Sequence, residues 1–589
     1  MKNRKENNTS GNWMTLNLVI QLLLLFISGG VFSQIPYCSW VKDVPNGKTR
    51  GVWLEPTDFG NYYALGYITG GFGDITISTI DGDETITPTG SNSCLIEKYN
   101  DEGDILWVKA ILSTGQVLGN AVVTDEFENL YVVGYFNGTC DFDPGTGTSN
   151  ITSNGTEIFV LKLDLNGNFI WVKNLEAISG SSNSMANAVV ADTNGDIVIA
   201  GEFDGSVDFD PSGSTNVKNA AGSTDVFVLK MDALGNLVWV KIFEGSSLDN
   251  CFSACTDTSN NIYLTGRFHG TVDFDPGAGT NYHSDVTSFG DVFSVKLNSN
   301  GDLVWVNTIG GDMNDFGEAI TVDSSGNVYT YGRFRNTVDF NPGVAVNEVT
   351  SAGNQDAFIQ KVDTDGNFIW AKTFGGTSSE IAKSMAVDKD QNLYLCGYFK
   401  GTTDLDPSTN SDNYSALGTF NNGFLSVLDS AGNYMWGRMI PSISQVLITD
   451  IIVNENNEVL ITGEFNDTVD FDPSSGVKQL VSAYGGMFVA KYKMGYIGFE
   501  ENKPIKHVSI YPNPSDGYQN FYLENDRPTF GTIQLVDTKS RVVKEVYDGV
   551  FAEGVNSFTV NLNDLPPGIY FYSVVFDNSE PMYFRTLKN

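Results

Sequence analysis

Seven short apolar segments, each centred on a tryptophan, recur along the 589-residue chain at intervals of about 66 residues. Residues 169–173 (FIWVK) and 303–307 (LVWVN) are two examples. Self-similarity at a fixed period indicates a repeat architecture in which each repeat forms the same supersecondary unit. A regularly recurring tryptophan is interpreted as a core residue. The tryptophans are Trp40, Trp107, Trp171, Trp239, Trp305, Trp370 and Trp436.

The pattern inside one repeat predicts its secondary structure. Alternating apolar residues indicate strands at 319–323, 327–334, 356–362 and 368–372. Gly-Asn before such a run is a hairpin signal, because glycine supplies the positive φ that the turn requires. Four antiparallel strands per repeat are typical of a propeller blade. We therefore predict an all-β fold with a seven-bladed β-propeller over residues 34–494.

The two ends of the array predict how it closes. The last repeat stops after its third strand, 486–492, whereas a tryptophan strand, 38–42, precedes the first repeat and has no partner there. Pairing of 38–42 with the last repeat would complete the seventh blade and remove an exposed sheet edge. An open solenoid is the alternative, and it would leave two exposed edges.

The N-terminus predicts export. A basic start followed by the apolar run 16–27 is typical of a signal peptide, here residues 1–33, and is short for a membrane span. No other segment approaches 18 consecutive apolar residues, so we expect no transmembrane segment in the mature chain. After a polar linker at 495–506, a second β-rich segment at 507–589 predicts a small Ig-like β-sandwich.

The charge and the cysteines narrow the classes of partner. Acidic residues outnumber basic ones 71 to 34, and the formal net charge of −37 repels a phosphate backbone, so we expect no nucleic-acid partner. The six cysteines stand where sister repeats carry other apolar residues, which favours core positions over disulfides or metal sites. They are Cys38, Cys94, Cys140, Cys251, Cys255 and Cys396.

Residues 266–277 (GRFHGTVDFDPG) resemble the bacterial β-propeller repeat family of the Val-Asp-Phe-Asp-Pro type. The resemblance covers most of the chain, and it implies the propeller fold without implying a particular activity.

The C-terminal segment is similar to the sorting domain of type IX secretion, the outer-membrane export route of Bacteroidetes. Its opening at 511–514 (YPNP) and its later stretch at 565–570 (LPPGIY) carry the resemblance. This likeness implies the type IX secretion machinery as a partner of 507–589. It also implies a secreted or outer-surface location, reached through the periplasm.

The paired aspartates of the Asp-x-Asp-Pro element are calcium candidates. Strand alternation places both carboxylates on one face and the phenylalanine on the other, and Ca²⁺ takes about six to eight oxygen ligands. The alternative is architectural, with Phe packed between blades and Asp and Pro fixing a turn. Recurrence in six repeats favours architecture. The candidates are Asp141, Asp143, Asp208, Asp210, Asp273, Asp275, Asp470 and Asp472.

A ligand is expected on the face that carries the long connections, because loops on rigid scaffolds carry function. Equivalent positions at the mouth of the predicted channel hold different residue types, so no repeated metal or anion site is built there. One asymmetric site and no site at all are both open. The ligand-face candidates are Asn120, Asn187, Phe252, Glu318, Lys383 and Thr449.

These features predict an exported binding or adhesion module for an extracellular glycan or protein. No nucleophile elbow, zinc-protease helix or phosphate loop occurs in the sequence, so no catalytic residue is predicted and calcium is the one cofactor candidate. The alternative is an extracellular polysaccharide-acting enzyme, a glycoside hydrolase or lyase, because paired carboxylates cleave glycosides. A structural surface component without a discrete ligand is the third hypothesis.

Overall fold

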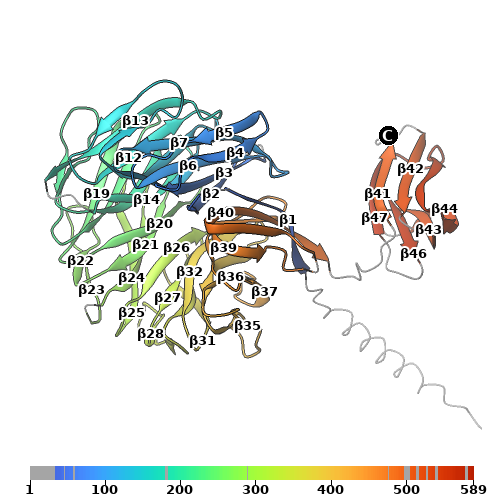
Figure 1. The fold of residues 1–589 in the computed structure, drawn as a ribbon. Helices are drawn as coiled ribbons and strands as arrows, with labels where there is room; N and C mark the ends of the chain where they lie inside the picture. The colour runs from blue at the N-terminus through green and yellow to red at the C-terminus, as the bar shows by residue number, and fades with distance from the viewer. Residues whose placement is uncertain are drawn as a thin grey trace, which may run out of the picture. The chain divides into compact units, whose positions relative to one another are not determined.

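The computed structural model describes most of the chain after residue 33 (Figure 1). All regular secondary structure in the described residues is β-strand, as predicted, and none of these residues forms a helix long and apolar enough to span a membrane. The predicted signal peptide and most of the linker lie outside them. The described ranges are 34–44, 47–57, 60–179, 183–287, 289–474, 476–496, 505–511, 517–525, 528–537, 541–576 and 582–588.

The chain divides into two compact units, Ser33–Tyr496 and the strands after Ile497. Within the described residues the larger unit has seven antiparallel groups of four strands, called sheets 1 to 7 in chain order. Sheets 1 to 3 are β2 (Thr49–Pro56), β3 (Tyr62–Thr69), β6 (Asn92–Tyr99) and β7 (Ile105–Ser113); β8 (Gln116–Thr124), β9 (Leu130–Asn137), β12 (Glu157–Leu163) and β13 (Phe169–Ser179); and β14 (Met185–Ala191), β15 (Ile197–Phe203), β18 (Asp225–Met231) and β19 (Leu237–Gly245).

Sheets 4 to 7 repeat this order. They are β20 (Asn250–Thr256), β21 (Ile262–Phe268), β24 (Asp291–Leu297) and β25 (Leu303–Gly311); β26 (Phe316–Val322), β27 (Val328–Phe334), β30 (Asp356–Val362) and β31 (Phe368–Gly376); β32 (Glu380–Val387), β33 (Leu393–Phe399), β36 (Asn422–Leu428) and β37 (Tyr434–Ile440); and β38 (Val446–Val453), β39 (Val459–Asp470), β40 (Gln479–Tyr496) and β1 (Gln34–Asp43).

Sheet 7 combines the start of this unit with its end. β1 pairs antiparallel with β40, with Val41 opposite Ala490, and Figure 1 shows the dark-blue β1 beside the orange β40. The predicted pairing of the N-terminal strand with the last repeat is therefore confirmed. The first strand of every sheet contacts the first strand of the next, and β38 of sheet 7 contacts β2 of sheet 1. The series of contacts thus returns to its start.

Short hairpins join neighbouring sheets. In sheet 4, β22 (Thr271–Asp273) and β23 (Tyr282–Ser284) form such a hairpin, and Asp273 pairs with Glu244 at the end of β19 in sheet 3. Sheets 2, 3, 5 and 6 have the same arrangement. Their hairpins are β10 (Thr139–Asp141) with β11 (Asn150–Thr152), β16 (Ser206–Asp208) with β17 (Val217–Asn219), β28 (Thr337–Asp339) with β29 (Glu348–Thr350), and β34 (Thr402–Asp404) with β35 (Asn413–Ser415).

The hairpin explains the repeated phenylalanine. Phe274 follows β22 and is buried, and its ring contacts those of Phe243, Phe268 and Phe293. Leu405, which replaces it in sheet 6, is equally buried. The element therefore joins two sheets by backbone pairing and fills the space between them with one large apolar side chain.

The tryptophans lie between sheets rather than all in the deep core. Trp40 and Trp436 are buried, as expected, but the other five repeat tryptophans are half-buried. Trp171 shows the reason: its ring lies against Gly235, in a turn of the next sheet, where φ is +79° and a Cβ atom would stand 3.2 Å from the ring. Glycine is required there for both the positive φ and the close approach. The hydrophobic clusters likewise combine residues of consecutive sheets.

All six cysteines are free, and five of them are buried. Their predicted role as small core residues is confirmed. Cys38 lies in the cluster between sheets 6 and 7, and Cys251 lies in that between sheets 3 and 4.

A buried lysine links the last sheet to the first. Lys491 of β40 is fully buried and bonds Glu458 at 2.6 Å, within its own sheet. It also bonds Asp101 of sheet 1, and it lies 3.3 Å from the Tyr62 hydroxyl. Because Asp101 and Tyr62 belong to the other end of the unit, this ion pair adds to the closure that β1 provides.

The smaller unit consists of two antiparallel sheets around one core. Phe521, Leu535 and Tyr572 are among its fully buried residues. Two sheets that share one core form the sandwich arrangement expected for this segment. The sheets are β41 (Ile505–Tyr511), β42 (Tyr518–Asn525) and β45 (Gly554–Asn561), and β44 (Val542–Phe551), β43 (Thr529–Asp537), β46 (Gly568–Phe576) and β47 (Met582–Lys588).

Candidate ligand-binding site

The first strand of every sheet in the larger unit contains a β-bulge at the same position. The pairing with the second strand skips one residue there, for example between Gly119 and Ala121 in sheet 2. A bulge re-aims the extra side chain and is a recurrent feature near functional sites. The bulged residues are Val52, Asn120, Asn187, Phe252, Glu318, Lys383 and Thr449.

All seven bulged residues line one cavity of about 370 Å³. The structure thus brings together all six ligand-face residues expected from the sequence. Sequence reasoning missed Val52, because an aliphatic side chain gives no chemical signal, and it also missed Arg50, Trp53, Tyr67 and Tyr135 in the same lining. A second cavity of about 260 Å³ continues along the same strands. It shares five lining residues with the first: Trp53, Ser253, Ala319, Ser384 and Asp450.

A signal for Tyr67 and Tyr135 did exist in the sequence. Both occupy the position after a second-strand glycine, and this position pairs with the residue two places before the bulge. It varies between sheets while the glycine repeats. The residues there are Tyr67, Tyr135, Glu202, Arg267, Arg333, Tyr398 and Glu464.

Glu318 is the charged centre of the cavity wall. Its Oε1 accepts from Arg333 Nε at 2.8 Å, and its Oε2 accepts from Lys383 Nζ at 3.3 Å. Burial acts to raise the pKa of Glu318, but the positive charges of Lys383 and Arg333 outweigh it and hold the pKa below its ordinary value. The carboxylate is therefore ionised, and both of its oxygens accept hydrogen bonds from cationic side chains.

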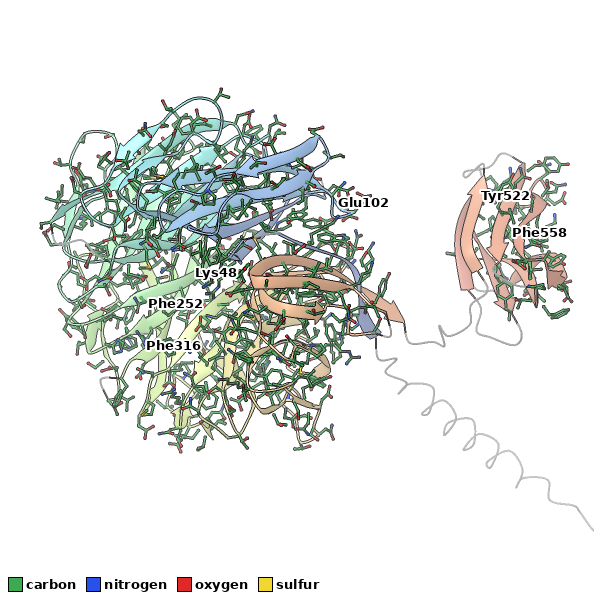
Figure 2. The ribbon with its side chains drawn as sticks, in the orientation of Figure 1. Lys48, Glu102, Phe252, Phe316, Tyr522 and Phe558 are labelled. Atoms are coloured by element: carbon green, nitrogen blue, oxygen red, sulfur yellow. The ribbon has the colours of Figure 1, made fainter. Side chains whose placement is uncertain are left out.

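Arginine and phenylalanine side chains stack beside this wall. Phe252 and Phe316 lie on neighbouring sheets (Figure 2), and their ring centroids are 6.5 Å apart. The Arg333 and Arg267 guanidinium groups lie 3.9 and 4.5 Å from the Phe316 ring centre. Burial lowers the pKa of Arg267, and the charge of Arg333 adds to this effect. Two like charges are thus held close together by one aromatic ring.

Amide side chains tie neighbouring first strands together. Asn120 Nδ2 donates to Ala186 O at 2.9 Å and to Asn187 Oδ1 at 3.1 Å. Asn187 Nδ2 in turn donates to Cys251 O at 3.0 Å and to Glu202 Oε2 at 2.7 Å. The bulged residues of sheets 2 and 3 therefore both line the cavity and hold the next strand.

Asp450 is the second carboxyl group in the cavity lining. Its Oδ1 accepts from Ser384 Oγ at 2.6 Å, and its Oδ2 accepts from Leu54 N at 2.7 Å. Burial raises the pKa of Asp450 to about 7, against the weaker opposing effect of these bonds. One oxygen therefore links sheet 7 to sheet 6, and the other links it to sheet 1.

The calcium candidates do not lie in this cavity. Asp273 Oδ1 accepts from the backbone amides of Asp275 at 3.1 Å and Asn281 at 2.7 Å, and Asp275 Oδ1 accepts from Gly277 N at 2.8 Å. The pairs Asp141/Asp143, Asp208/Asp210 and Asp470/Asp472 make the same bonds. These carboxylates hold the hairpin turn. Among the described residues no group of three or more His, Cys, Asp or Glu side chains could hold a metal ion.

Residues 509–583 match the family described as the secretion system C-terminal sorting domain. This match confirms the type IX sorting domain expected at the C-terminus. A protein with such a domain is exported through the periplasm to the cell surface or the medium.

Two curated proteins resemble parts of the chain. An uncharacterized WD repeat-containing protein, L264, of Acanthamoeba polyphaga mimivirus is 22% identical over 71% of this chain and 40% of its own length. Regulatory protein FlaEY of Caulobacter vibrioides is 23% identical over 39% of this chain and 24% of its own. The chain thus spans less than half the length of either relative.

Two solved structures also match, both of proteins of unknown function. One from Bacteroides caccae covers 56% of this chain and 94% of its own, with 10% identity and a TM-score of 0.25. One from Bacteroides thetaiotaomicron covers 76% and 99%, with 12% identity and a TM-score of 0.17.

Proposed function

We propose that the larger unit is a seven-bladed β-propeller that binds an extracellular ligand in its central cavity after type IX export. The proposed domains are residues 34–494 for the propeller and 507–589 for an Ig-like sorting domain. Seven four-stranded sheets, a series of first-strand contacts that returns to its start, and the completion of sheet 7 by β1 support the propeller. The WD repeats of the viral relative agree, because a WD repeat is a propeller blade.

The variation of residue type among the seven bulged positions is the observation that best supports a binding role. The seven bulged positions hold Val, Asn, Asn, Phe, Glu, Lys and Thr, whereas residues that pack between the sheets recur from repeat to repeat. A purely structural position would keep its residue type. A cavity lined by aromatic and apolar groups with a few convergent polar ones is the usual form of a ligand site.

The chemistry of the lining favours a saccharide that carries a carboxylate. Tyr67 and Tyr135 lie close together, and neither hydroxyl has a hydrogen-bond partner among the described residues. Aromatic faces with free hydroxyls suit the apolar faces and hydroxyl groups of a sugar. Arg50 adds a cation to the wall of an otherwise acidic protein, and it suits an anionic substituent. The second cation of the lining, Lys383, is already bonded to Glu318.

A glycoside-cleaving enzyme is the second candidate. The pKa of Asp450 is raised to about 7 while that of Glu318 is lowered, and two carboxyl groups with pKa values driven apart are the pattern of an acid and its partner. The bonds to both oxygens of each group favour a binding role, because a general acid or nucleophile needs a free oxygen.

The test is a titration calorimetry series with neutral and uronate-containing oligosaccharides on the purified exported chain. We expect uronate-containing sugars to bind more tightly. Tyr67→Phe with Tyr135→Phe should weaken binding about tenfold for each hydrogen bond lost. Tyr282→Phe is the matched control, because Tyr282 is exposed on the β23 hairpin.

Binding that is equal in the double variant and the parent would contradict a site at this cavity. Failure of every saccharide to bind would contradict the ligand class. Release of reducing ends that disappears in Glu318→Gln would instead establish the enzyme.

A further inference from the structure

A second cluster of polar side chains lies between sheets 5 and 6, outside the cavity. Asp356 begins β30 in sheet 5, Glu380 begins β32 in sheet 6, and Thr403 lies in β34. The backbone holds them together: Glu380 N donates to Gln355 O at 2.9 Å, and Gly376 pairs with Thr403. Asp356 is 5% exposed, and Glu380 and Thr403 are 0% exposed.

Four oxygen atoms of this cluster have no hydrogen-bond partner within the described part of the chain. They are Asp356 Oδ1, both carboxylate oxygens of Glu380, and Thr403 Oγ1. The other Asp356 oxygen accepts from Ala352 N at 2.8 Å. A buried carboxylate without a donor or a counter-charge is costly, so this cluster calls for a positively charged partner.

At the equivalent junctions between sheets 3 and 4 and between sheets 4 and 5, most of the buried carboxylate oxygens accept hydrogen bonds. Asp315, the counterpart of Glu380 between sheets 4 and 5, accepts from Gly311 N and Arg335 N, both at 3.0 Å. Between sheets 3 and 4, Asp225 accepts from two backbone amides, and one oxygen of Asp249 lacks a partner among the described residues. The junction of sheets 5 and 6 therefore differs from its sisters in having four such oxygens together.

Sheet 6 departs from the repeat at the two positions that extend the cluster. Glu380 stands where sheets 4 and 5 have Asp249 and Asp315. Thr403 stands where the hairpins of sheets 4 and 5 have Val272 and Val338. The first change lengthens a carboxylate and the second adds a hydroxyl, so both bring oxygen atoms to the same place.

We propose that this junction binds one divalent cation of the calcium type, with Glu380, Asp356 and Thr403 supplying oxygen ligands. Two carboxylates balance a divalent charge, and an all-oxygen donor set suits Ca²⁺ rather than zinc or copper. Mg²⁺ demands a small octahedral site and keeps several waters, which a fully buried pair of carboxylates does not favour. The ion would clamp sheet 5 to sheet 6.

The experiment is calcium and magnesium titration of the chelator-treated full chain by calorimetry, with thermal melts in parallel. We expect one calcium-selective site, with Mg²⁺ at least tenfold weaker and a melting temperature that rises with Ca²⁺ concentration. Glu380→Gln should abolish both responses. Thr403→Val installs the residue of the sister hairpins, so it should fold and weaken calcium binding about tenfold.

Asp273→Asn with Asp275→Asn is the control, and it should leave the titration unchanged. The proposal is wrong if the parent shows no calcium-selective binding, or if Glu380→Gln binds calcium as the parent does. If Glu380→Gln does not fold, Thr403→Val decides: tenfold weaker binding supports the site, and unchanged binding overturns it.

Discussion

The larger unit contains two regions built from the same repeats by opposite rules. Between the sheets the same residues recur: the tryptophan against a turn glycine, and the buried phenylalanine or leucine of the joining hairpin. At the bulges of the first strands, six residue types occupy the seven equivalent positions. Recurrence follows from packing, because each junction must bury a similar surface. Variation of residue type is tolerated where side chains face a cavity instead of a neighbouring sheet. Under the proposed function, these side chains select the ligand.

Removal of β1 should give the largest effect at the junctions. Deletion of residues 35–44 exposes the edge of β40 and removes the buried Cys38 and Trp40, so we expect a loss of more than about 5 kcal/mol in unfolding free energy, or aggregation. Thermal melts and gel filtration would measure it. Deletion of residues 497–589 is the control, because these residues belong to the other unit. A β1 deletion that melts as hot and as cooperatively as the parent would refute closure by this strand.

The next effect concerns the joining hairpin. Phe274→Ala should cost about 3–5 kcal/mol, because it empties a fully packed space between sheets 3 and 4. Phe274→Leu, which copies Leu405 of sheet 6, should cost under about 1.5 kcal/mol. Urea unfolding measures both. If Asp273→Asn with Asp275→Asn proved more costly than Phe274→Ala, the turn rather than the phenylalanine would hold the junction.

Acid should weaken sheet 7 at Glu458, the carboxylate that pairs with the buried Lys491. Burial opposes ionisation of Glu458, but its bonds to Lys491, Asn454 and Lys493 lower its pKa to about 2 from an ordinary 4.5. The stability it contributes is present above pH 4.5 and is lost as pH falls from 4.5 to 2, by up to about 3 kcal/mol. Urea unfolding of Glu458→Gln should show a flatter pH dependence in this window. An equal slope in parent and variant would assign the acid sensitivity elsewhere.

The smallest effect on stability is expected at the bulges. Phe252→Asn installs the residue of sheets 2 and 3, and Val52→Thr installs that of sheet 7. Each should change the unfolding free energy by less than about 1 kcal/mol, because the side chains face the cavity. Saccharide affinity should fall in Phe252→Asn while its melting temperature holds. A loss of several kcal/mol in either variant would show that the bulges are as constrained as the junctions.

The sequence alone determined the features that repeat. The period of the tryptophan strands, the glycine turns and the lone strand at residues 38–42 predicted the strands, the all-β class and the pairing of β1 with β40, because local propensity and periodicity encode them. The opening at 511–514 and the stretch at 565–570 likewise predicted the sorting domain. Equivalent positions in the repeats also identified six of the seven bulged residues, since a repeat places equivalents side by side.

Tertiary structure decided what no single repeat contains. Arg50 and Trp53 of sheet 1 line one cavity with Met185 of sheet 3 because strands distant in the chain meet there. The ionised state of Glu318 depends on Arg333 in its own sheet and Lys383 in the next. The unpartnered oxygens of Asp356 and Glu380 come together across a junction, where burial removes the water that would satisfy them. The ionisation state, burial and proximity of these side chains depend on several sheets at once. They therefore cannot be predicted from the sequence of one repeat.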